Sequence, residues 1–238
     1  MKLGITNYAT EKFHLWRDFL RHPCQLPVEQ WQQFWPENPT KYREIVGACS
    51  VGVKKLSSKI LELIREGLGL ESGFFDDEFD QPLSLLANHY PPCPNPSLVL
   101  GVSKHSDPNL ITILLQDDIH GLQVFKDGKW IGVEPLPNAF VVNFGYTLQI
   151  ISNGKLKSAE HRVVTNSSHA RTSAGFFVST SKDRTIEPAE ALIDASNPPV
   201  YNSFKYKEIL GHFLSVNGDS EVVLEPFKVQ APFKLANQ

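Results

Sequence analysis

Short apolar segments separated by turn residues fill the chain from Leu83 onward, and they restrict its fold more than any other feature. The segments read LSLLANHY, NLITILLQ, GLQVF, KWIGVEP, AFVVNF, EHRVV and SAGFFVS, and PPCPNPS, KDGK, SNGK and NSSH separate several of them. Closely spaced short strands of this kind are typical of an all-β sandwich or barrel. The Asp127-Gly128 pair predicts a hairpin, because these residues accept the positive φ angles of a tight turn.

Helices are expected on both sides of this β-rich part. Apolar residues recur at three- and four-residue steps from about Arg43 to Leu70, which predicts an amphipathic helix packed on the core. Residues 1–42 are aromatic and interrupted by prolines, so we expect an irregular segment lying against the surface. TLQIISN after Gly145 predicts a short helix, and the stretch from about Glu187 to Tyr206 predicts helical or irregular structure.

Charge and hydropathy exclude several classes of partner. The 238 residues carry a net charge of -3 with a pI near 6.2, so there is no basic footprint for nucleic acid. No apolar run reaches the length of a membrane span, and the N-terminus lacks the apolar core of a signal peptide. Cys24, Cys49 and Cys93 are far apart and form no CxxC pair. A cytoplasmic protein without nucleic-acid or membrane partners is therefore expected.

The triplet His105-Ser106-Asp107 carries the first sign of chemistry. On an extended chain, residues two apart point to the same face, so an imidazole and a carboxylate at this spacing can bind one metal ion. The triplet with the following Pro108 also fits a surface turn.

A third metal ligand has to come from a distant strand, and His161 is the candidate. Alternation in AEHRVV puts His161 on the same face as Val163, with Glu160 and Arg162 on the other face. A histidine at such a position is either a core residue or a ligand. Two histidines and one carboxylate leave coordination positions open, which suits non-haem iron(II), although zinc hydrolases use similar ligands.

Arg171 and Ser173 favour the iron interpretation. They lie two apart at the start of the segment RTSAGFFVS and share a face. A planar guanidinium can bind a carboxylate bidentately, and a serine hydroxyl can add a further hydrogen bond. A dicarboxylic keto acid that chelates the metal needs such a clamp at its far end, and Tyr90 offers a phenolic hydroxyl for the same carboxylate.

The segments NHYPPCPNP, KHSDPNLITILLQD, GLQVFKDGKWIGVEPLPNAFVVN, LQIISNGKLKSAEHRVV and RTSAGFF together resemble the plant 2-oxoglutarate/iron(II)-dependent dioxygenases, which include flavonoid, alkaloid and hormone hydroxylases. The resemblance implies a mainly β fold with flanking helices, a double-stranded β-helix (jelly-roll) core. It implies iron(II) at His105, Asp107 and His161. It also implies 2-oxoglutarate held by Arg171, Ser173, Tyr90 and Asn88.

The same resemblance implies an activity and its partners. A monomer is expected to hydroxylate, desaturate or demethylate a small molecule of plant secondary metabolism, consuming dioxygen and releasing succinate and carbon dioxide, with ascorbate as reductant. Aromatic side chains at positions 16, 125, 144, 176 and 177 are candidates for the substrate pocket, although each would also fit an ordinary core: Trp16, Phe125, Phe144, Phe176 and Phe177. Two other functions fit the residues, a metal-dependent hydrolase or isomerase on a cupin-like barrel and a non-catalytic or weakly active truncated relative.

The order of these features predicts three regions. Residues 1–82 are expected to be the remainder of an N-terminal helical region, because members of the family usually begin further upstream. Residues 83–185 are expected to form the jelly-roll core, and residues 186–238 a helical or irregular extension packed on it. Many relatives also have a Gly-Asp pair where this chain has Gly145-Tyr146.

Overall fold

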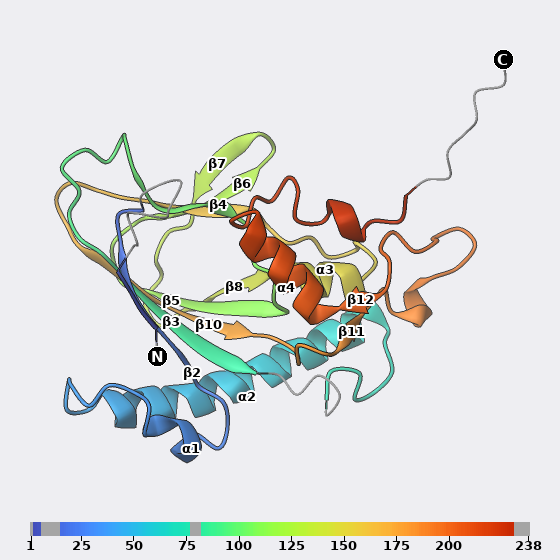
Figure 1. Cartoon of the computed structure of the whole chain (residues 1–238), viewed down its shortest axis with the longest axis horizontal. Helices are drawn as coiled ribbons and strands as arrows, with labels where there is room; N and C mark the ends of the chain where they lie inside the picture. Colours follow the sequence, from blue (N-terminus) through green and yellow to red (C-terminus); the bar gives the residue numbers. More distant parts are fainter. Residues whose placement is uncertain (1, 6–14, 77–81, 231–238) are drawn as a thin grey trace.

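Two antiparallel sheets dominate the computed structural model, which describes residues 2–5, 15–76 and 82–230 (Figure 1). The larger sheet has the strand order β1-β2-β3-β10-β5-β8, the smaller β4-β9-β6-β7, and β11 pairs with β12. The strands are β1 (Lys2–Ile5), β2 (Asp18–Pro23), β3 (Leu83–Tyr90), β4 (Leu100–His105), β5 (Ile111–Gln116), β6 (Leu122–Lys126), β7 (Lys129–Gly132), β8 (Val141–Phe144), β9 (His161–Val164), β10 (Arg171–Val178), β11 (Thr185–Ile186) and β12 (Phe204–Lys205).

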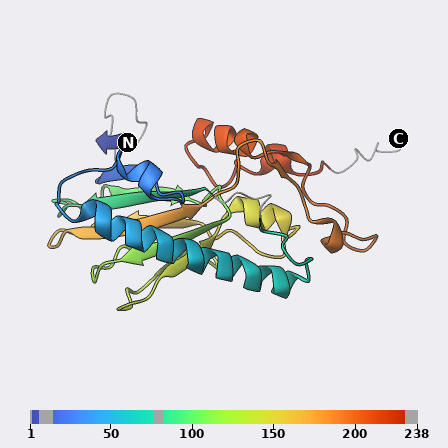
Figure 2. The same ribbon diagram turned by 90° about the horizontal axis from the view of Figure 1, so that it is seen from below.

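Helices pack outside the sheets, and α2 is the longest of those described. Figure 2 shows α2 running across the larger sheet, on the side away from α4. The α-helices are α1 (Glu29–Gln32), α2 (Tyr42–Leu68), α3 (Tyr146–Ile151) and α4 (Tyr206–Ser215), and two short 3-10 helices are η2 (Glu190–Leu192) and η3 (Glu225–Phe227). Within the described part of the chain, no helix is long and apolar enough to cross a membrane.

The two faces of the larger sheet have different roles, which follow from the alternation of side chains along each strand. Leu85, Ile113 and Phe176 point to one face, where they are buried in the same apolar core as Val53 and Leu61 of α2. The opposite face of the same strands turns toward the smaller sheet. Polar side chains collect there, in a cavity between the two sheets.

Most of the elements predicted from the sequence are confirmed. The predicted helix from Arg43 to Leu70 is α2, and the short helix after Gly145 is α3. β6 and β7 form the predicted hairpin, with φ of 50° at Asp127 and 77° at Gly128. These elements depend on local periodicity or turn chemistry, which a sequence shows directly.

The prediction that residues 1–42 are irregular was wrong for several segments. β1 and β2 extend the larger sheet, with Phe19 opposite Asn88 and Leu20 opposite Ala87, and α1 follows them. The strand segment DFLRHP has little alternation of its own, and it is ordered by hydrogen bonds to the exposed edge of β3. The region 186–238 contains η2 before α4, which begins only at Tyr206. The division of the chain at residues 82/83 and 185/186 stays a prediction.

Candidate metal and co-substrate site

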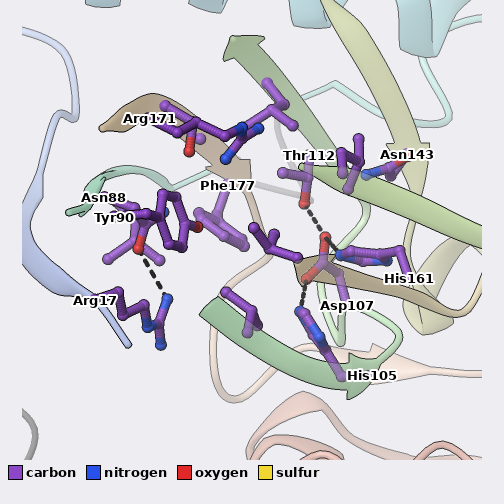
Figure 3. Close-up of a pocket in the computed structure, with 17 residues that line it drawn as sticks. Arg17, Asn88, Tyr90, His105, Asp107, Thr112, Asn143, His161, Arg171 and Phe177 are labelled. Carbon is purple, nitrogen blue, oxygen red and sulfur yellow. Dashed lines mark hydrogen bonds and ion pairs between the residues drawn. The ribbon is translucent and has the colours of Figure 1, made fainter. Parts of the chain in front are cut away.

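Three side chains that could bind a metal meet at one end of the cavity (Figure 3). His105 is the last residue of β4, Asp107 lies in the turn that follows, and His161 is the first residue of β9. The two strands pair so that His105 lies opposite His161. One donor atom from each of the three residues lies within 4.8 Å of the others. Among the described residues, this is the only group of three or more His, Cys, Asp or Glu side chains that could hold a metal ion.

Each imidazole is oriented by a backbone carbonyl group. Nδ1 of His105 lies 2.9 Å from the oxygen of Ser103, and Nδ1 of His161 lies 3.0 Å from the oxygen of Ala159. Because a carbonyl oxygen can only accept, each Nδ1 carries the proton and donates it. Both Nε2 lone pairs are then free and directed toward Asp107, at 3.6 Å from His105 to Oδ1 and 4.0 Å from His161 to Oδ2. This tautomer is the one that a metal-binding histidine needs.

The protonation states of this cluster also suit a metal. Burial by itself would raise the pKa of Asp107, but the neighbouring His105 and His161 outweigh it and lower the pKa to about 2. Burial lowers the pKa of His161, and the proximity of His105 lowers it further, against the opposing charge of Asp107. An ionised carboxylate and a neutral imidazole are the forms that coordinate a cation, so little proton release would accompany binding.

Thr112 fixes the carboxylate of Asp107, and the sequence reasoning missed it. Its Oγ1 donates to Oδ2 of Asp107 at 2.6 Å, and the amide of Asn109 donates to the same Oγ1 at 3.1 Å. Both side chains are buried. The sequence does contain a signal for this role. Thr112 lies between Ile111 and Ile113 in an apolar strand, and alternation places its side chain on the opposite face from those isoleucines.

Arg171 lies on the same cavity wall and is almost completely buried, with 2% of its surface exposed. Its Nη2 donates to Oε1 of Gln116 at 2.7 Å, and its Nε donates to the carbonyl oxygen of Ile119 at 3.2 Å. Its Nη1 is buried and has no hydrogen-bond partner among the described residues. An unpaired buried donor on a cation is costly, and a carboxylate in the cavity would satisfy it. The supporting Gln116 was not singled out from the sequence.

The other predicted clamp residues lie beside Arg171. Ser173 faces the cavity two residues further along β10, and Asn88 and Tyr90 come from the neighbouring strand β3. The strand register puts Tyr90 opposite Arg171 and Asn88 opposite Ser173. The guanidinium carbon lies 5.2 Å from the centre of the Tyr90 ring. The structure therefore groups all four residues on one wall, facing the cluster of His105, Asp107 and His161.

Of the five aromatic pocket candidates, Phe177 lines the cavity and the other four do not. Phe144 packs against the apolar core beneath the sheet, as does Phe176. Phe125 is 42% exposed and stacks on Trp130, because it lies on the opposite face of β6 from Leu122, which lines the cavity. Alternation along the strands explains these placements.

Trp16 has a bracing role at the end of the larger sheet. Its indole N–H donates to the carbonyl oxygen of Pro91 at 2.9 Å, and its backbone N–H donates to Leu100. The side chain thereby holds the segment before β2 against the ends of β3 and β4. It is not part of the cavity lining.

Gly145 is a test of how tightly the turn carrying Asp107 is packed. A Cβ at this position would lie 1.9 Å from the carbonyl oxygen of Asn109 and 3.0 Å from that of Asp107. We expect Gly145→Ala to displace this turn, to lower the free energy of unfolding by about 3 kcal/mol and to weaken metal binding in parallel. Thermal denaturation and calorimetric metal titration would measure both effects. Gly52→Ala is the matched control, since a Cβ there meets nothing within 4 Å inside α2 and should be neutral or stabilising. A Gly145→Ala protein as stable as the Gly52→Ala protein would contradict this expectation.

Comparison with known proteins places this arrangement in a family. The profile of the 2OG-Fe(II) oxygenase superfamily matches residues 82–180. Hyoscyamine 6-dioxygenase of Hyoscyamus niger is 44% identical over 93% of this chain and 64% of its own length. Flavanone 3-dioxygenase 2 of Oryza sativa subsp. japonica is 42% identical over 93% of this chain and 65% of its own length. The chain thus spans just under two thirds of the length of these relatives.

Solved structures show the same fold. The crystal structure of JOX2 in complex with 2OG, Fe and JA superimposes with a TM-score of 0.85 at 36% identity, covering 91% of this chain and 65% of that chain. The structure of a rice dioxygenase for auxin oxidation superimposes with a TM-score of 0.81 at 27% identity, covering 90% and 73%. The two sheets are therefore the jelly-roll predicted from the sequence, and the chain belongs to the 2OG-Fe(II) oxygenase superfamily, among the plant 2-oxoglutarate-dependent dioxygenases.

Proposed function

We propose that this protein is a 2-oxoglutarate- and iron(II)-dependent oxygenase that hydroxylates, desaturates or demethylates a small plant metabolite. The observation that carries the proposal is one cavity with two complementary halves. One half is the cluster of two imidazoles and a carboxylate, and the other is a buried guanidinium whose Nη1 lacks a partner among the described residues. A dicarboxylic keto acid has a matching end for each half, a keto acid group for the metal and a distal carboxylate for the guanidinium.

The donor set fits iron(II), and each residue has a definite task. His105, Asp107 and His161 would hold the ion on one side, which leaves the positions toward the cavity open. Arg171, with Ser173 and Tyr90 beside it, would bind the distal carboxylate of 2-oxoglutarate, and Asn88 lies within the same group. When bound, iron(II) and 2-oxoglutarate supply the activation of dioxygen, with release of succinate and carbon dioxide.

The protein's own contribution is to bind, orient and exclude water. Apolar side chains form much of the cavity wall between the two sheets: Leu86, Val102, Leu114, Leu122, Val163 and Phe177. Such a wall keeps solvent from the reacting centre and leaves the few polar groups to set orientation. Ascorbate is the proposed reductant that keeps the iron ferrous.

We further propose a cytoplasmic monomer that acts on a free small molecule rather than on nucleic acid or at a membrane. The net charge of -3, with 23 Lys and Arg against 26 Asp and Glu, argues against nucleic acid as a partner. The hyoscyamine and flavanone dioxygenases and the dioxygenase for auxin oxidation are each named for a small metabolite, and they support a small metabolite as the class of substrate.

Anaerobic titration with iron(II) and 2-oxoglutarate tests the proposal most directly. We expect a weak visible charge-transfer band when both are present and none with either alone, because the band belongs to the chelate of the keto acid with ferrous iron. Zinc(II) in place of iron(II) is the control, since it should bind without producing a band. On admission of air, the ferrous sample should form succinate.

The alternative hydrolase on a similar barrel predicts a different result. It would need the metal but not 2-oxoglutarate, and it would release no succinate. A protein that binds iron(II) yet neither forms the chelate band nor produces succinate would rule out the proposed function.

A further inference from the structure

A second guanidinium, that of Arg17, lies on the wall of the same cavity. It comes from the segment directly before β2 and was not singled out from the sequence. Figure 3 shows Asn88 and Tyr90 lying between Arg17 and Arg171, with the three candidate metal ligands to one side of all of them. The two arginines thus belong to separate parts of one cavity.

The hydrogen bonds of Arg17 leave most of its donors unused. Nη1 donates to Oδ1 of Asn88 at 2.8 Å, and the guanidinium carbon lies 5.2 Å from the centre of the Phe19 ring. Nε is buried and has no partner among the residues that the structure describes. No carboxylate of those residues forms an ion pair with Arg17. A half-buried cation in this state favours an anionic partner.

The charges of the cavity identify where that anion comes from, given the proposed function. Four charged groups would be present: the divalent metal, the Asp107 carboxylate, the dianionic keto acid and the Arg171 guanidinium. Their charges sum to zero, so the positive charge of Arg17 has no counter-charge among them. A single negative charge on the remaining occupant of the cavity, the substrate, would balance it.

We infer that Arg17 binds the carboxylate of the substrate and that the enzyme prefers small apolar monocarboxylates. The apolar part of such a molecule fits the aliphatic and aromatic walls that face the metal cluster, which include Leu86, Leu114 and Phe177. The planar guanidinium fits a carboxylate by two parallel hydrogen bonds. Arg17 is then a specificity-determining residue, and Asn88 holds it in place. This inference rests on the proposed function.

A pair of near-isosteric probes, trans-cinnamate and trans-cinnamamide, tests the inference by binding alone. The protein is loaded with zinc(II) and saturated with N-oxalylglycine, an isostere of 2-oxoglutarate, so that Arg171 is occupied. Ligand-observed NMR titration then gives the dissociation constant of each probe. We expect the wild-type protein to prefer the carboxylate by about tenfold or more, as a charge-assisted hydrogen bond in a partly buried site provides.

The variants separate a local contact from the general field of the protein. In Arg17→Gln the two probes should bind about equally, a ratio of dissociation constants of about one. Arg17→Lys should keep part of the preference because the charge remains. Arg162→Gln removes the same charge from β9, on the face opposite His161 and outside the cavity lining, and should keep the full preference. Equal binding of the two probes by the wild type, a preference retained in Arg17→Gln, or a preference lost in Arg162→Gln would overturn the inference.

N-oxalylglycine itself distinguishes failure of the inference from failure of the proposed function. Its affinity should fall in Arg171→Ala and stay unchanged in Arg17→Gln. If N-oxalylglycine binds neither the wild type nor any variant, the co-substrate assignment fails. Cinnamate and cinnamamide can still be compared on the protein without N-oxalylglycine. If Arg17→Gln weakens N-oxalylglycine instead of cinnamate, Arg17 belongs to the co-substrate clamp and the inference is overturned.

Discussion

His161→Ala should abolish succinate formation, with a loss of roughly a thousandfold or more. The side chain offers a neutral Nε2 whose direction is fixed by the bond from Nδ1 to Ala159, and no other described histidine lies close enough to replace it. Asp107→Ala should behave in the same way. Asp107→Glu should also be poor, because one extra methylene moves the carboxylate away from the bond that Thr112 donates. Metal content and succinate release would be measured on the same samples.

The loss should be specific to the site rather than a consequence of unfolding. The core between the larger sheet and α2 does not include these residues, so thermal midpoints should change little. His120→Ala is the matched control, since this exposed histidine pairs with Glu134 at the surface and should leave turnover intact. Succinate production retained in His161→Ala would count decisively against the assignment of the metal ligands.

Arg171→Ala should raise the concentration of 2-oxoglutarate required for turnover by a large factor, while the requirement for iron(II) stays near that of the wild type. Removing one partner of a buried charge-assisted pair costs roughly 2–5 kcal/mol, which corresponds to about thirtyfold to several thousandfold in affinity. The guanidinium faces Gln116 and the cavity rather than the metal cluster, so the ion itself should bind normally. Arg171→Lys should recover only part of the affinity, because a point charge cannot reproduce the planar fork.

Steady-state measurements in which 2-oxoglutarate and iron(II) are varied in turn would show whether only the requirement for 2-oxoglutarate rises. Arg162→Ala is a suitable control, because Arg162 bonds to Gln123 and stacks on Trp130 on the opposite face of β9 from His161. An unchanged dependence on 2-oxoglutarate in Arg171→Ala would show that the clamp lies elsewhere in the cavity.

Local patterns in the sequence were sufficient for much of the fold. The spacing of apolar residues determines α2, the Asp127-Gly128 pair determines the β6–β7 hairpin, and the short apolar runs determine the strands of the core. Each of these depends on neighbours a few positions away in the chain. β2 was missed for the opposite reason. It is ordered by hydrogen bonds to β3, which lies more than sixty positions further along, and its own residues alternate too weakly to indicate a strand.

The candidate site also has some features that depend on near neighbours in the chain and others that depend on distant contacts. The pairs His105/Asp107 and Arg171/Ser173 were visible in the sequence, because two residues that lie two positions apart form a local pattern. His161 was proposed from its place in a short apolar strand and from the family resemblance. The contacts of Arg17 with Asn88 and of Arg171 with Gln116 join positions more than fifty residues apart. Only strand register brings such positions together, and register is set by the packing of whole sheets. The sequence by itself therefore indicated the residues of the candidate site, and the tertiary structure decided which other side chains surround them.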